Sequence, residues 1–230
     1  MGGDAVRAVL ARPSGRTYRY ARSHRIVEVC GLLFGSALLF ETARRALEQL
    51  TTSSALAAFG CVALGLCLSD LASGVVHWAA DSYGSPRMPI FGGFVRTFRE
   101  HHRDQLDITR HDAVETNGDV FIFSSPLHFV ILCTVGDPLA LAAVFGVFLG
   151  SYSNSQIHKW AHQADPPRLV RTLQRVRVFL SPDHHSRHHA GAHESHYCIT
   201  TGWMNGVLDR LRFFRLAEAV LSKLGIQRSH

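Results

Sequence analysis

Histidine is the residue type in this chain with the clearest capacity for chemistry. The sequence contains 15 His against 18 Asp and Glu combined, and most of the His residues occur in tight groups. The densest is HHSRHH at residues 184–189. Neutral imidazoles need partners when they are buried and have no reason to gather on a surface, so this group predicts metal binding. On a helix, His185, His188 and His189 would converge on one side.

Two further groups add candidate ligands. His158 and His162 are four residues apart, so on a helix they would share one face with Asn154, one turn earlier. His101 and His102 are adjacent, and neighbouring residues on a helix diverge by about 100°. These two would serve two metals, or one metal and one hydrogen bond.

A polar stripe interrupts an otherwise apolar segment. Asp70, Ser73, His77 and Asp81 follow one another at steps of three and four residues. Ionisable groups at membrane depth are functional by default. We expect His77 to bind metal, whereas Asp70 is either functional or buried in a hydrogen bond to a neighbouring helix.

The ligand type limits the kind of metal centre. Imidazole dominates, and the five Cys show no CxxC spacing. A catalytic zinc uses three protein ligands, so a larger set of histidines implies two metals. Imidazole suits Fe, Zn, Cu and Ni alike, and the residues alone do not choose among them. Histidine in place of glutamate argues against the carboxylate-bridged di-iron bundles.

Four apolar blocks predict a helical membrane protein. They cover residues 26–40, 55–77, 120–135 and 138–152, and the chain is 47% hydrophobic with a net charge of +6. Asp137 and Pro138 predict a helix start between the last two blocks. These two blocks are shorter than the roughly 20 residues that usually span a bilayer, so a buried or re-entrant hairpin is the alternative.

The distribution of arginine orients these spans. With four spans, the connections at about 43–53 and 136–137 contain only Arg44 and Arg45, and the other basic residues fall on the opposite side. The positive-inside rule therefore places both termini in the cytosol, together with the His-bearing segment 77–119 and the chain after residue 152. The predicted fold is all-α, a multi-pass helical membrane protein of about four spans with a cytosolic His-rich di-metal cap. The scattered arginines do not predict a nucleic-acid partner.

Several strings together resemble a known family over about residues 60–215. The chain is similar to the plasmanylethanolamine desaturases, also called CarF or Kua lipid desaturases. The strings are SGVVHWAADSYGS (73–85), FREHHRDQLDITRHDAVETNGD (98–119), NSQIHKWAH (154–162), HHSRHH (184–189) and HESHYCITTGWMN (193–205).

The resemblance implies an activity and a ligand set. The activity is the O2-dependent formation of the 1,2 vinyl ether bond in the sn-1 alkyl chain of ether phospholipids, plasmanyl to plasmenyl ethanolamine, in plasmalogen synthesis. The implied cofactors are two Fe ions. Asn154 resembles the asparagine of acyl-CoA desaturases that holds a metal-bound water. The implied metal ligands are His77, His101, His102, His111, His158, His162, His185, His188, His189 and His193.

The same reading divides the chain and predicts its partners. Residues 1–25 form a basic cytosolic arm, 26–215 the membrane lipid desaturase domain and 216–230 a C-terminal amphipathic tail. A bacterial inner membrane suits this topology. The chain has no flavin or NAD fingerprint, so electrons would come from an external carrier such as cytochrome b5 or a ferredoxin with its reductase. A fatty-acid or sterol hydroxylase, a His-rich metal transporter or sensor, and a hydrolytic metalloenzyme are the alternatives.

Overall fold

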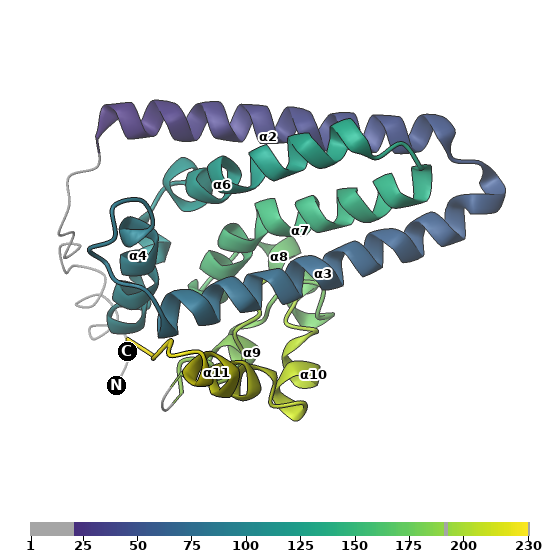
Figure 1. Ribbon diagram of the computed structural model, residues 1–230. Helices are drawn as coiled ribbons and strands as arrows, with labels where there is room; N and C mark the ends of the chain where they lie inside the picture. Colours follow the sequence, from purple (N-terminus) through teal and green to yellow (C-terminus); the bar gives the residue numbers. More distant parts are fainter. Residues whose placement is uncertain (1–20, 191–192, 230) are drawn as a thin grey trace.

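Helices make up all the regular secondary structure in the part of the chain that the structure describes. This computed structural model describes residues 21–190 and 193–229. Four long helices, α2 (Arg22–Gln49), α3 (Ala55–Ser82), α6 (Ala113–Thr134) and α7 (Pro138–His162), run along the molecule (Figure 1). The prediction of an all-α chain is confirmed for these residues. The shorter elements are η1 (Thr52–Ser54), α4 (Gly92–Arg103), α5 (Asp107–Arg110), α8 (Arg168–Arg175), α9 (Pro182–His185), α10 (Asn205–Arg210) and α11 (Phe213–Lys223).

Two of the long helices have the length and composition of membrane spans. These are Arg22–Gln49 and the continuous stretch Thr52–Ser82. Both present large apolar side chains outward, among them Phe40, which is 70% exposed, and Leu56, which is 83% exposed. This outward apolar surface indicates association with a membrane. The count of four spans and the orientation remain predictions.

The turn between α6 and α7 forms as the sequence predicts. Asp137 caps α7 by accepting a hydrogen bond from the backbone N–H of Ala140, and Pro138 is the first helical residue. The helix then runs for 25 residues, to His162. This length confirms that Asn154, His158 and His162 lie on one continuous helix.

Glycines bring α3 and α7 into close contact. A Cβ atom on Gly65 would lie 2.2 Å from the carbonyl oxygen of Ala143, and one on Gly146 would lie 2.3 Å from that of Val62. Only glycine allows backbones this close, so the crossing fixes how the two helices lie against each other. Both helices run toward the same end of the molecule, where α4 lies (Figure 1).

The C-terminal segment packs beside the last turns of α3. Leu208 of α10 and Phe214 of α11 form a buried cluster with Trp78 and Tyr197. The predicted domain boundaries remain predictions, although α2 already begins at Arg22, inside the predicted arm, and α11 begins at Phe213, ahead of the predicted tail. Residues 1–20 of the arm lie outside the described part.

Candidate metal centre

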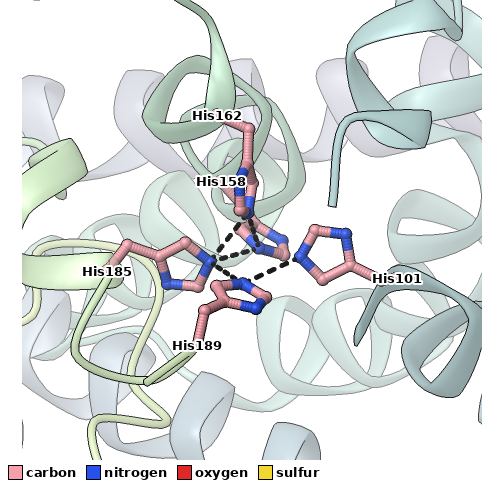
Figure 2. Close-up of side chains that lie close together, drawn as sticks. All are labelled: His101, His158, His162, His185 and His189. Atoms are coloured by element: carbon pink, nitrogen blue, oxygen red, sulfur yellow. Dashed lines mark hydrogen bonds between the residues drawn. The ribbon is translucent and has the colours of Figure 1, made fainter. Parts of the chain in front are cut away.

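Five histidines from three segments form the first group of the candidate centre. α4 provides one, α7 provides two, and α9 with the turn that follows it provides two. Their ligand nitrogens all lie within 4.8 Å of one another, and the rings point toward a common centre (Figure 2). We call this set the five-histidine group; its members are His101, His158, His162, His185 and His189.

The distances between nitrogens in the five-histidine group fit a set of metal ligands. The Nε2 atom of His185 lies 2.8 Å from that of His158, and 2.9 Å from those of His162 and His189. One imidazole nitrogen carries either one proton or one lone pair, so it cannot satisfy three such contacts by hydrogen bonding. Two nitrogens that each lie about 2.1 Å from one metal at a right angle are about 3.0 Å apart.

Burial keeps these imidazoles in the form that binds metal. His185 is 1% exposed, and desolvation holds its pKa well below the usual value. Burial likewise lowers the pKa of His189 to about 2 and keeps the pKa of His101 well below its usual range. Neutral imidazole is the ligand form, so near neutral pH no proton has to leave before a cation enters.

A second group lies beside the first. We call it the mixed group, because it combines three histidines with a carboxylate: His77 and Asp81 of α3, His102 of α4, and His188. The Oδ2 atom of Asp81 lies 3.4 Å from Nε2 of His77, 3.4 Å from that of His102 and 3.6 Å from that of His188. The two groups are adjacent, since the rings of His188 and His189 have centroids 5.3 Å apart.

Backbone carbonyls fix the orientation of two rings in the mixed group. The Nδ1 atom of His77 donates to the carbonyl oxygen of Tyr197 at 3.0 Å, and that of His188 donates to the carbonyl oxygen of Ser195 at 2.8 Å. A carbonyl only accepts, so Nδ1 carries the proton and Nε2 faces inward with its lone pair. Such outer contacts hold metal-binding histidines in their tautomer and direction.

Asp70 holds the loop that directly follows the residues with these carbonyls. It is fully buried, and its Oδ1 atom accepts hydrogen bonds from the backbone N–H groups of Thr200, Thr201 and Gly202 at 2.8–3.1 Å. Its Oδ2 atom accepts from the N–H of Met204 at 3.0 Å. Of the two roles expected for Asp70, the structure shows the buried hydrogen bond, made here to a loop.

The structure places histidines that are neighbours in the sequence in different groups. His101 and His102 belong to different groups, as the divergence of adjacent residues on a helix predicts. The convergence expected for His185, His188 and His189 is wrong, because His188 belongs to the mixed group. The physical reason is that α9 ends at His185, and the turns that follow point the later rings in different directions.

Three predicted site residues lie outside both groups. The ring of His193 is beside that of His102, with centroids 4.3 Å apart. His111 faces Asp107, with Nε2 and Oδ2 3.2 Å apart, and the Oδ1 atom of Asn154 accepts a hydrogen bond from Ser155. Their roles stay predictions. Asp81 is the residue absent from the predicted ligand set, and its spacing of four residues from His77 is the signal that could have found it.

Three of the histidines left out of the predicted site lie outside both groups. His128 bonds to Thr42 and Tyr152 between the long helices. His196 pairs with Asp209 at 3.0 Å, and His24 lies 3.4 Å from a carboxylate oxygen of Glu28. His230 lies outside the described part.

Comparison with known proteins identifies the family. A sequence model described as the lipid desaturase domain matches residues 66–229. The chain belongs to the lipid desaturase family. Similar proteins in this family include a plasmanylethanolamine desaturase of Myxococcus xanthus, 43% identical over 171 residues, and plasmanylethanolamine desaturase 1 of Mus musculus, 39% identical over 175 residues.

The lipid desaturase relatives differ in their named substrates. The chloroplastic fatty acid desaturase 4 of Arabidopsis thaliana is 33% identical over 174 residues, which are 71% of this chain and 51% of that protein. The Myxococcus and mouse alignments cover 70% and 71% of this chain. The chain spans 59% and 64% of the length of those two relatives. No solved structure gives a significant match.

Proposed function

We propose that this protein is a plasmanylethanolamine desaturase, which forms the 1,2 vinyl ether bond in the sn-1 alkyl chain of an ether phospholipid. The observation that carries the proposal is the pair of adjacent histidine groups at one end of the long apolar helices. The identities of 43% and 39% to proteins named for this activity support it.

The proposed cofactors are two iron ions. The five-histidine group would hold one, and the histidines of the mixed group would hold the other. Bound iron would supply the activation of O2 and the oxidising power that the reaction needs. The protein's own residues bury the site and keep the imidazoles neutral and correctly turned. The roles of His111, His193 and Asn154 belong to the proposal through the resemblance alone.

The proposed reaction balances with an external reductant. One hydrogen leaves C1 and one leaves C2 of the alkyl chain, and a double bond forms between these carbons. O2 takes up these two hydrogens, two further electrons and two protons, and two water molecules form. We propose cytochrome b5, or a ferredoxin with its reductase, as the source of the two electrons.

A membrane location suits a lipid substrate. We propose that α2, α3, α6 and α7 span the bilayer and that both termini and both histidine groups face the cytosol, which in a bacterium would be the inner side of the inner membrane. The proposed organisation is an arm at 1–25, the desaturase domain at 26–215 and the amphipathic tail at 216–230. The outward apolar side chains of α2 and α3 support contact with lipid.

Acyl-chain desaturation is the second candidate, because the relatives include a fatty acid desaturase. Hydroxylation by the same centre is a third outcome. Desaturation and hydroxylation share the first hydrogen removal, and a barrier difference of about 1.4 kcal/mol between the following steps already gives a tenfold bias. The identity of the product therefore decides among them.

The test is expression in cells that lack vinyl ether lipids and are supplied with an alkyl-ether phosphatidylethanolamine. We expect an acid-labile vinyl ether that releases a long-chain aldehyde and forms only with O2. His158→Ala and His162→Ala should abolish it, whereas His196→Gln, outside both groups, should not. A hydroxylated product alone, or desaturated acyl chains with intact alkyl ethers, would contradict the proposal.

A further inference from the structure

Asp81 is a buried carboxylate without an ordinary partner. It lies in the last turn of α3, its side chain is 9% exposed, and neither carboxylate oxygen accepts a hydrogen bond from any described residue. Burying a carboxylate without compensation is costly. Within the described part of the chain, only histidines lie within ion-pair distance of it.

The histidines around Asp81 cannot all compensate it by hydrogen bonding. The Nδ1 protons of His77 and His188 are given to backbone carbonyls, so in the neutral rings both Nε2 atoms turn lone pairs toward the carboxylate. Lone pairs on two nitrogens and an oxygen repel one another unless a positive charge lies between them. A cation at their centre removes the repulsion, and buried charges in proteins are paired or coordinate metals.

The distances support a metal over a simple ion pair. A charge-assisted N–H···O bond is about 2.7–2.9 Å long, shorter than the separations of 3.4, 3.4 and 3.6 Å between Asp81 and the three rings. Two ligand atoms about 2.1 Å from one metal at a tetrahedral angle are about 3.4 Å apart. The Nε2 atoms of His102 and His188, 3.2 Å apart, fit the same arrangement.

We infer that Asp81 is a metal ligand, so that the two metals have unlike surroundings. One is held by five imidazole nitrogens, and the other by three imidazole nitrogens and the carboxylate of Asp81. The inference rests on the proposed di-metal function. It replaces an all-histidine centre with an asymmetric one, in which the negative charge lies on one side.

The first experiment counts metals in the full-length protein, purified in detergent and loaded with ⁵⁷Fe. The wild-type protein should hold two irons with two distinct Mössbauer doublets of equal area. Asp81→Asn should hold about one iron, with the doublet of the mixed group lost and the other kept. Asp209→Asn is the matched control, because Asp209 also pairs with a histidine but lies outside both groups; it should keep both doublets.

A second variant covers the case in which Asp81→Asn does not fold. Asp81→Cys loaded with Co²⁺ should gain a thiolate-to-cobalt charge-transfer band that the wild-type protein and Asp209→Cys lack. Two unchanged doublets in Asp81→Asn, or no new band in Asp81→Cys, would overturn the inference. A wild-type protein with fewer than two irons would contradict the proposed di-metal centre itself, and with it the role of Asp81. Two irons in the wild-type protein with no effect of Asp81 would refute only the inference.

Discussion

Two buried carboxylates on α3 have opposite surroundings. Asp70 and Asp81 are eleven residues apart, about 16 Å along the helix. The oxygens of Asp70 accept four backbone N–H groups, whereas those of Asp81 face three imidazoles and accept no hydrogen bond in the described part of the chain. Because both carboxylates are buried, burial alone does not separate the structural role of Asp70 from the ligand role that we infer for Asp81. The groups that face their oxygens do separate them.

Buried histidines show the same contrast. His128 and His77 are both 0% exposed. Between the long helices, Thr42 donates to a backbone carbonyl, so it accepts from Nε2 of His128, and Tyr152 then donates to Nδ1. Both ring nitrogens of His128 are thus satisfied. His77 is satisfied at Nδ1 only, and its buried Nε2 atom has no hydrogen-bond partner among the described residues.

The largest effect should come from His185, whose Nε2 atom contacts three other imidazole nitrogens of the five-histidine group. His185→Ala removes the centre of the five-histidine group, and we expect a loss of the iron that we propose for this group and a fall in turnover of more than about 100-fold. Elemental analysis and product formation measure the two effects. His184→Gln changes the adjacent histidine, which lies outside both groups, and should keep most of the iron and most of the turnover. Equal losses in both variants would show that metal binding does not distinguish His185 from His184.

The metal-free protein should be sensitive to acid. Burial lowers the pKa of His188 to about 3 and that of His189 to about 2, against about 6.5 in an unfolded chain. Below pH 6.5 these two residues bind protons in the unfolded chain but not in the folded site. The part of the free energy of unfolding that they contribute is therefore complete above this pH and falls as the pH drops toward 3. Thermal unfolding of the metal-free protein at pH 7.5, 6 and 5 measures the trend, and a flat profile would contradict it.

Asp70→Asn should lower stability without removing a ligand. The amide keeps one carbonyl oxygen and places an NH2 group against backbone donors, so we expect a loss of about 2–3 kcal/mol. Because the loop of Thr200 no longer holds the Tyr197 carbonyl in place, the mixed group should bind its metal more weakly than the five-histidine group does. Unfolding in detergent and stepwise chelation measure these effects. Equal weakening of both metals would contradict the positioning role of Asp70.

The smallest effect should follow the loss of His128. His128→Leu keeps the shape roughly but leaves the hydroxyl groups of Thr42 and Tyr152 to rearrange, at a cost of about 1–2 kcal/mol. Iron content should remain that of the wild-type protein. If iron were lost at unchanged stability, His128 would belong with the site histidines, and the contrast between His128 and His77 would be wrong.

The local parts of this site could be predicted from the sequence. The start of α7 at Asp137 and its continuation to His162 depend on neighbours in the chain, and so does the divergence of His101 and His102. The partners of α3 could not be predicted in the same way. Asp70 and Asp81 have the same residue type in the same polar stripe, and what separates them is a loop more than 110 residues later in the chain, whose backbone groups leave no pattern in the sequence.

The glycine crossing of α3 and α7 sets the distance between two histidines that lie further along these helices. Gly65 and His77 are twelve residues apart, and so are Gly146 and His158. From the crossing, the two helix segments therefore have equal lengths, about 18 Å each, and they end in different histidine groups. A rotation of one helix by only about 3° at the crossing would move the histidine at the end of its segment by about 1 Å. The ring centroids of His77 and His158 are 6.1 Å apart. The close helix contact at Gly65 and Gly146, two residues without a side chain, therefore controls the spacing between the two histidine groups.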